Sequence, residues 1–315
     1  MYDKIQNHTE IMKSEHFMPS TDEGQQLHYI TWVPDGAPKA VLQLIHGMEE
    51  YIDRYDELAR LLADDGWAVI GHDHLGHGQS GRWERGFFTE RKDGADVVIA
   101  DIRAVFEEAE RRWPGVPHFL MGHSMGSFFL RRYLVLHHDD VSGAVICGTG
   151  WYNALLTGSA LALTYLVGGL CGWHRRSTFL RAVTSPHAMA FRSEGEGAWL
   201  SRNPENVERF NADPLCGFGF TAGAYRDMYR NLLRLSRGVD YETLRGANFP
   251  ILVISGAEDS VGGTKAVHKV VAQYRSLGLQ HVEEALFPDD RHEVLFEPDK
   301  NTVQNTIKDF LNRYL

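Results

Sequence analysis

The residue Ser124 has the surroundings of a catalytic nucleophile. It lies in the stretch GHSMG, between Gly122 and Gly126, with a short apolar run before it and an apolar helical pattern after it. A serine at the tip of a strand-to-helix turn needs a strained backbone, and glycines two residues away on each side let strand and helix pass without a Cβ clash. Its hydroxyl attacks only when a histidine accepts its proton and a carboxylate orients that histidine. We therefore expect such a pair later in the chain.

Asp259 and His292 are the candidates for the acid and the histidine. Asp259 lies just past an apolar run that ends at Gly256, and His292 lies in the loop after the next predicted strand. Glu258 is the alternative acid, and we favour Asp259 because of its spacing from Gly256. Serine, acid and histidine then follow one another in the chain order that α/β hydrolases use.

The tetrahedral intermediate of acyl transfer also needs backbone N–H donors. The residue after the serine, Met125, offers one amide. The loop after the predicted strand at residues 40–45 turns at Gly47 and offers the amide of Met48. We expect His46, in the same turn, to be a structural neighbour and not a second base.

A histidine-rich stretch, GHDHLGHGQSG, raises an alternative chemistry. With Asp73, the spacing of His72, His74 and His77 approaches that of zinc hydrolases, but Gly76 stands where the carboxylate ligand should be. A zinc hydrolase built on these histidines would need no serine and would be inhibited by chelators. We expect no metal and no other cofactor.

Alternating apolar strands and amphipathic helices must position these residues. The alternation runs to about residue 147 and resumes at residue 249, and about 85 residues between these points break it. Strands that alternate with helices form parallel sheets. The sequence therefore predicts an α/β fold with a mostly parallel central sheet flanked by helices and an inserted helical cap. We expect a first part of the core at 1–150, a helical cap at 151–236 and a second part of the core at 237–315.

The predicted cap begins with an uncharged segment, residues 151–173, that is about as long as a bilayer is thick. A span there would separate the strands before it from those after it, so we predict no transmembrane span. Its leucines and valine recur at helical steps on more than one face, at Leu155, Leu156, Leu163, Leu166, Val167 and Leu170. We expect the segment to form the wall of an acyl-binding pocket, and transient contact of the cap with lipid aggregates or a membrane surface is a further expectation.

Composition narrows the partners and the compartment. The formal net charge is -10 and no dense cluster of Lys and Arg is present, which argues against a nucleic-acid partner. The three cysteines are odd in number and far apart, which favours reduced thiols and a cytoplasmic location. The first twenty residues lack the apolar run of a signal peptide.

Five motifs together resemble one family. The stretches HGMEEY, DHLGHGQSG, GHSMG, GAEDSV and RHEVLFE resemble the monoacylglycerol lipase and lysophospholipase branch of the α/β-hydrolase superfamily, which is often grouped with serine aminopeptidases. The likeness covers the chain from about Leu27 to the C-terminus. It implies a carboxylic ester hydrolase that cleaves small-molecule lipid esters through an acyl-enzyme on Ser124, with a histidine-rich loop that binds no metal. The chain departs from the family at Glu49, where a Gly is usual, at Tyr51, where a His is usual, and at Leu75, where an Arg is usual.

An aminopeptidase or amidase of the same fold is the alternative activity. A free amine would need an anchoring acid, and the sequence offers Glu49, Glu50, Glu194 and Glu196 for that role. The sequence leaves the acyl chain length, the head group and the oligomeric state open.

Overall fold

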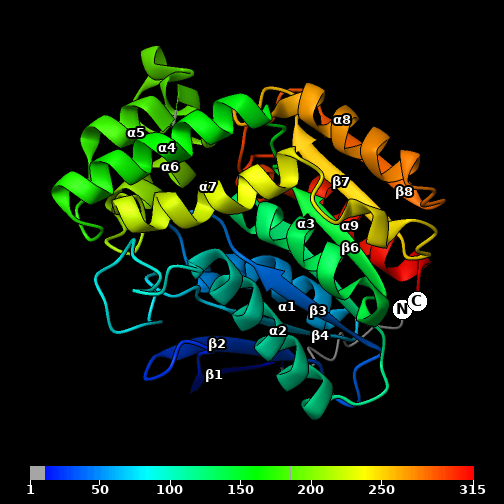
Figure 1. The fold of residues 1–315 in the computed structure, drawn as a ribbon. Coiled ribbons are helices and arrows are strands. Elements are labelled where there is room, and N and C mark those ends of the chain that lie inside the picture. The colour runs from blue at the N-terminus through cyan, green and yellow to red at the C-terminus, as the bar shows by residue number, and fades with distance from the viewer. Residues whose placement is uncertain (1–10, 185) are drawn as a thin grey trace.

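A mixed sheet forms the centre of the protein (Figure 1). The computed structural model describes residues 11–184 and 186–315, and within them eight strands pair in the order β1-β2-β4-β3-β5-β6-β7-β8. The strands are β1 (Met12–Pro19), β2 (Gln26–Val33), β3 (Ala40–Ile45), β4 (Trp67–His72), β5 (His118–His123), β6 (Gly143–Cys147), β7 (Ile251–Gly256) and β8 (Val282–Phe287). The first ten residues of the N-terminal segment, in which we found no signal-peptide-like run, lie outside the described residues.

The prediction of a mostly parallel sheet is confirmed. Strands β3 to β8 run parallel, whereas β2 pairs antiparallel with both β1 and β4. The inner strands are apolar runs buried on both faces, as parallel strands require. Gln43 is a polar residue in the middle of β3, and its side-chain amide donates to the carbonyl of Ile102 at 2.9 Å. Its amide nitrogen is thereby satisfied, whereas its Oε1 is buried without a hydrogen-bond partner among the described residues.

Helices cover both faces of the sheet. Two helices pack on one face, α1 (Asp56–Asp64) and α9 (Lys300–Arg313). The other face carries α2 (Gly94–Arg112), α3 (Met125–His137) and α8 (Gly263–Ser276). Short 3-10 helices occur at Ile52–Tyr55, His138–Asp140, Pro186–Met189, Arg192–Glu194, Tyr241–Leu244 and Val294–Phe296.

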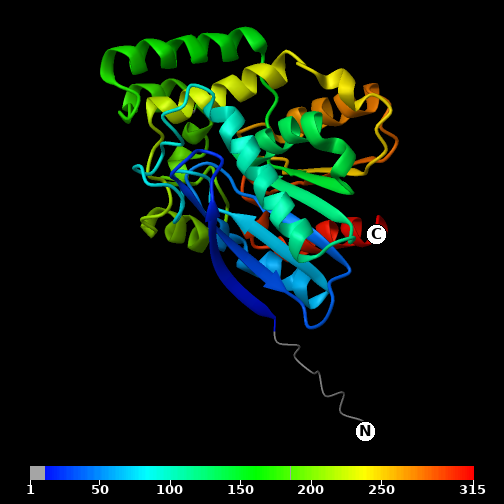
Figure 2. The ribbon, with the colours of Figure 1, turned by 60° about the horizontal axis from the view of Figure 1, so that its bottom comes forward.

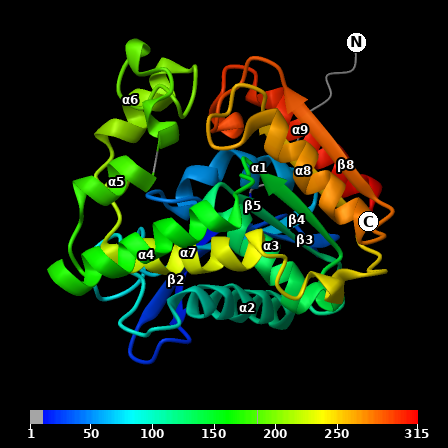
Figure 3. The ribbon, with the colours of Figure 1, turned by 45° about the horizontal axis from the view of Figure 1, so that its top comes forward.

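Four helices lie between β6 and β7, in the segment we expected to be a cap. They are α4 (Ala154–Cys171), α5 (Thr178–Thr184), α6 (Pro204–Ala212) and α7 (Ala222–Ser236). Figure 3 shows α4 and α7 side by side, with α5 and α6 to one side of them. No strand of the sheet comes from the described residues of this segment.

The helix α4 packs with its small and polar residues inward. Its buried residues are Thr157, Thr164 and Gly168, and Gly168 lies so close to the ring of Trp173 that an added Cβ would be 2.3 Å from it. Four leucines of the helix are exposed, Leu155 and Leu170 to 78% each, Leu156 to 71% and Leu166 to 58%, whereas Leu161, Leu163 and Val167 are partly buried against the core. In Figure 2, α4 forms the upper edge of the molecule, with α7 beneath it. This face is a large apolar surface that nothing in the described chain covers.

Among the described residues, α4 is the one helix long and apolar enough to cross a membrane. A single crossing would put β6 and β7, which flank the inserted segment, on opposite sides of the bilayer. These two strands are hydrogen-bonded neighbours in one sheet. We therefore describe α4 as a surface helix.

Candidate active site

The sharp turn between β5 and α3 carries Ser124. Its backbone has φ 52° and ψ -120°, a conformation that non-glycine residues rarely adopt and that marks strained functional turns. Only glycine fits on either side of this turn. A Cβ added to Gly122 would lie 2.6 Å from the carbonyl oxygen of Gly126, and one added to Gly126 would lie 2.1 Å from the carbonyl oxygen of Ile45. The turn thus places Ser124 directly between the carboxyl end of β5 and the first residue of α3.

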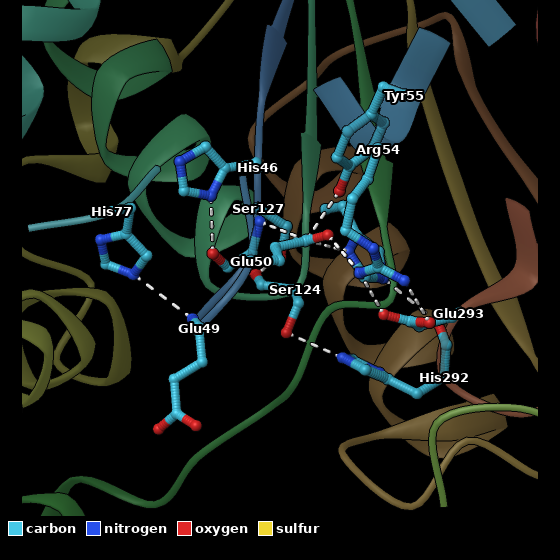
Figure 4. Close-up of polar contacts among 12 residues, drawn as sticks. His46, Glu49, Glu50, Arg54, Tyr55, His77, Ser124, Ser127, His292 and Glu293 are labelled. Atoms are coloured by element: carbon cyan, nitrogen blue, oxygen red, sulfur yellow. Dashed lines mark hydrogen bonds and ion pairs between the residues drawn. The ribbon is translucent and has the colours of Figure 1, made fainter. Parts of the chain in front are cut away.

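The structure brings the three residues of the predicted triad together. The Nε2 atom of His292 lies 2.8 Å from the Oγ of Ser124 (Figure 4). On the other edge of the same ring, Nδ1 lies 3.0 Å from Oδ1 of Asp259. When Nδ1 carries the proton and donates to Asp259, Nε2 is free to accept the proton of the serine.

Asp259, and not Glu258, is the acid beside the histidine. Asp259 is buried and also accepts hydrogen bonds from the amide of Val261 at 2.8 Å and the hydroxyl of Ser255 at 2.9 Å, whereas Glu258 is exposed. Burial alone would raise the pKa of Asp259. The charge and hydrogen bond of His292 and the two other donors outweigh burial and lower that pKa, so Asp259 stays ionised.

The two amides predicted to hold the oxyanion belong to residues that border the same cavity as Ser124. Met125 is the first residue of α3, so its N–H belongs to the turn whose amides have no partner inside the helix. Met48 follows Gly47, whose own amide donates to Oε1 of Glu50 at 2.6 Å. That bond fixes the turn which presents the Met48 peptide.

A buried ionic network, which sequence reasoning missed, supports this turn. Oε1 of Glu50 accepts a hydrogen bond from Tyr55 at 2.8 Å and lies 3.2 Å from Nδ1 of His123, while Oε2 accepts from Arg54 at 2.6 Å. Burial alone would raise the pKa of Glu50, but the charges of Arg54 and His123 lower it strongly. Arg54 also binds Glu293, the residue after His292 (Figure 4). The sequence offered one signal of this network, because the acid Glu293 directly follows the predicted catalytic histidine.

The histidine-rich loop packs beneath the site and holds the turn of the predicted oxyanion hole. His77 uses both ring nitrogens, since Nε2 accepts from the amide of Glu49 at 3.3 Å and Nδ1 lies 3.2 Å from the carbonyl of Leu75. Burial lowers the pKa of His72 and of His77 to about 3, so both rings are neutral. Among residues 11–184 and 186–315, no group of three or more possible ligands is placed to hold a metal ion. Glu49 has φ 59°, which explains why its family position usually holds Gly.

Ser124 opens into a cavity of about 690 Å³. Part of the lining is apolar and includes four residues of α7, Tyr225, Met228, Tyr229 and Leu232. The other part carries polar groups such as Arg181, Arg192 and Asn211. The expectation that the segment 151–173 forms the acyl-binding wall is wrong for all of it except Tyr152, because no residue of α4 borders the cavity and the helix packs against α7.

The acids considered for binding a free amine fall into two groups. Glu50 is committed to Arg54, and Glu194 pairs with Arg291 at 2.7 Å. Glu49 and Glu196 border the cavity, and neither forms an ion pair within the described part of the chain. Burial raises the pKa of Glu49, which favours its uncharged form.

Comparisons with known proteins agree with this geometry. The sequence model of the family described as serine aminopeptidase, S33, matches residues 36–299. Monoglyceride lipase of Mus musculus is 29% identical over 286 residues, which cover 87% of this chain and 86% of the lipase. Monoacylglycerol lipase of Mycolicibacterium smegmatis is 27% identical over 312 residues, which cover 96% of this chain and 98% of that protein. The structure of a thermostable carboxyl esterase from Bacillus coagulans superimposes with a TM-score of 0.86 at 22% identity, covering 97% of this chain and 99% of the esterase.

Proposed function

The chain belongs to the serine aminopeptidase, S33, family of the α/β-hydrolase superfamily and is a carboxylic ester hydrolase, and we propose that it cleaves monoacylglycerols or lysophospholipids through an acyl-enzyme on Ser124. The observation that carries the proposal is the hydrogen-bonded series Ser124, His292 and Asp259, of which Ser124 and His292 border the cavity. The similar lipases support the substrate class.

In the first half of the reaction, Oγ of Ser124 attacks the ester carbonyl carbon while Nε2 of His292 takes the hydroxyl proton. The amides of Met48 and Met125 receive the negative charge of the tetrahedral intermediate. His292 then gives its proton to the leaving alcohol as the ester bond breaks. In the second half, His292 takes a proton from water while the water oxygen bonds to the acyl carbon. His292 then returns this proton to Oγ of Ser124 as the acyl bond to Oγ breaks, which releases the fatty acid.

The cavity fits an ester with an apolar chain and a polar head. The apolar lining from α7 suits a fatty acyl chain, and the polar lining suits a glycerol or similar head group. We propose that residues 151–236 act as the cap over this cavity, because α7 lies within them. The outward leucines of α4 support transient contact of this cap with lipid aggregates or a membrane surface. A cytoplasmic location is part of the proposal and is supported by the three free cysteines.

A substrate screen tests the proposal. Wild type and Ser124→Ala are compared on p-nitrophenyl esters, monoacylglycerols, lysophospholipids and aminoacyl amides, and both are treated with a fluorophosphonate probe. The matched control is Ser127→Ala, a buried serine whose hydroxyl donates to the carbonyl of Ser124. We expect Ser124→Ala to lose at least about 10⁴-fold in ester turnover and all labelling, while Ser127→Ala remains labelled. Faster cleavage of amides than of esters by wild type would favour the amidase activity, and labelling of Ser124→Ala would refute the nucleophile.

A further inference from the structure

The indole of Trp199 lies against the ring of the candidate catalytic histidine. The ring centroids of Trp199 and His292 are 5.3 Å apart, with the planes inclined by 31°. Trp199 belongs to the segment between α5 and α6, far from His292 in the sequence, and it also borders the cavity. A third ring, His187, packs on the indole at 4.8 Å. The histidine therefore has an aromatic neighbour supplied by the proposed cap.

Hydrogen bonds between the chain neighbours of Trp199 and those of His292 hold the two rings next to each other. The amide of Glu293 donates to the carbonyl of Leu200 at 2.7 Å, and the guanidinium of Arg291 donates to the carbonyl of Ala198 at 2.8 Å. The residues that flank His292 thus bind the residues that flank Trp199.

Further bonds continue the same contact along the chain. Ser201 donates to Glu297 at 2.8 Å, and the side-chain amide of Asn203 donates to the carbonyl of Phe296 at 3.0 Å. The segment 198–203 is therefore attached to the loop of the histidine and not only to the other cap helices.

From these contacts we propose that Trp199 is a positioning residue for His292, an inference that rests on the proposed function. Two edges of the imidazole are held by hydrogen bonds to Ser124 and Asp259, and the indole limits rotation of the ring out of that line. The face of an indole also attracts a cation within about 6 Å, so it favours the imidazolium that forms during the reaction. Both effects act on the chemical step and require no contact with the acyl chain.

The alternative role for Trp199 is that of a wall of the cavity, because the residue also borders it. An indole that serves only as a wall would affect long-chain esters and leave short ones untouched. A positioning residue affects every ester alike, since each substrate uses the same histidine. Acyl chain length and the separate responses of kcat and KM therefore distinguish the two roles.

The experiment measures kcat and KM with p-nitrophenyl acetate and p-nitrophenyl dodecanoate for wild type, Trp199→Ala and Trp199→Phe. The matched control is Trp151→Ala, which removes a tryptophan at the start of the proposed cap. Trp151 is 37% exposed and does not border this cavity. We expect Trp199→Ala to lose about 10- to 100-fold in kcat on both esters, with KM changed less than about threefold, because small misplacements of reacting groups cost about that much. Trp199→Phe keeps an aromatic face and should retain kcat within about threefold, as should Trp151→Ala.

A loss confined to dodecanoate, or an unchanged kcat on acetate, would overturn the positioning role. If Trp199→Ala does not fold, Trp199→Leu replaces it, and equal kcat values for the Leu and Phe variants would count against the inference. Ser124→Ala in the same assay distinguishes a failure of the inference about Trp199 from a failure of the proposed function. If that variant is inactive and Trp199→Ala behaves like wild type, the inference about Trp199 fails while the proposed function stands.

Discussion

Arg54 and Glu293 form a buried, two-pronged ion pair, with Nη1 2.7 Å from Oε1 and Nη2 2.9 Å from Oε2. The same guanidinium binds Glu50, in the turn that carries the predicted oxyanion amide. Glu293 also accepts a hydrogen bond from Asn206 of α6 at 2.7 Å. One arginine thus joins the oxyanion turn to the histidine loop, and Glu293 extends the connection to the proposed cap.

Arg54→Met should destabilise the protein far more than the loss of an ordinary surface charge. It leaves the carboxylates of Glu50 and Glu293 buried without their cation, which typically costs about 3–5 kcal/mol. The matched control is Arg60→Met, which breaks a solvent-exposed pair with Asp56 worth at most about 1 kcal/mol. Thermal unfolding should show a decrease of at least about 6 °C for Arg54→Met and little change for Arg60→Met. Equal decreases would mean that the network adds no stability.

Asp259→Asn should reduce ester turnover by roughly 10⁴-fold, because the amide no longer stabilises the imidazolium or fixes the tautomer of His292. Glu258→Gln should leave turnover within about twofold of wild type, since its side chain is exposed. Both variants are measured by kcat/KM on one p-nitrophenyl ester. A larger loss from Glu258→Gln would move the acid to that residue.

Dialysis against EDTA should leave ester hydrolysis unchanged. The basis is the geometry of the histidine-rich loop, in which both ring nitrogens of His77 already have partners. Activity is measured before and after dialysis, with and without added Zn²⁺. A loss that Zn²⁺ restores would return the metal hydrolase to consideration.

The local signals in the sequence pointed to three residues that lie together in the structure, but could not show which face of a helix points inward. Ser124, Asp259 and His292 each follow a strand of the parallel sheet, so their convergence could be expected from the parallel sheet alone. For α4 the same kind of pattern failed, because its exposed leucines are as apolar as Leu163 and Val167, which pack against the core beside the buried Thr164. That arrangement is unusual for a helix on a globular core, and periodicity cannot reveal it.

Other features depend on contacts between distant segments. The network of Arg54 and the pair of Trp199 and His292 join the inserted segment to the last loop of the core, and no local spacing encodes them. The strands β1 and β2 were also not predicted, and β1 lies at the sheet edge with none of its residues fully buried.

Acid should destabilise the protein steeply through its buried histidines. Burial lowers the pKa of His118 from 6.5 to about 3, and its ring stacks on Phe106 at 3.8 Å. Below pH 6.5, His118 therefore binds a proton in the unfolded chain but stays neutral in the folded chain. The free energy of unfolding is therefore highest above pH 6.5 and decreases as the pH falls toward 3. Each such histidine costs about 1.4 kcal/mol per pH unit in this window.

His118→Phe removes one of these protons and should recover about 2 kcal/mol of the stability that wild type loses between pH 6.5 and pH 5. The measurement is urea unfolding at pH 7.5 and at pH 5. The control is His268→Phe, a change at an exposed position. The prediction fails if both variants lose as much stability as wild type at pH 5.

The outward face of α4 should bind lipid surfaces. Leu166 and Leu170 are 58% and 78% exposed, and the described part of this helix carries no charge that would oppose insertion. Each leucine side chain transferred from water into the acyl region contributes roughly 1–2 kcal/mol, so the double change Leu166→Ser and Leu170→Ser should weaken vesicle binding by about 30-fold or more. Binding is measured by co-sedimentation with phosphatidylcholine vesicles. The matched control is Leu136→Ser, a change at a leucine near the end of α3 that is 44% exposed and lies outside the cap.

Hydrolysis of p-nitrophenyl acetate in solution should be unaffected by the double change, because neither leucine borders the cavity. Hydrolysis of monoacylglycerol embedded in vesicles should decrease as vesicle binding decreases. If the double variant sediments like wild type, or if Leu136→Ser weakens binding equally, the face of α4 is not the lipid contact.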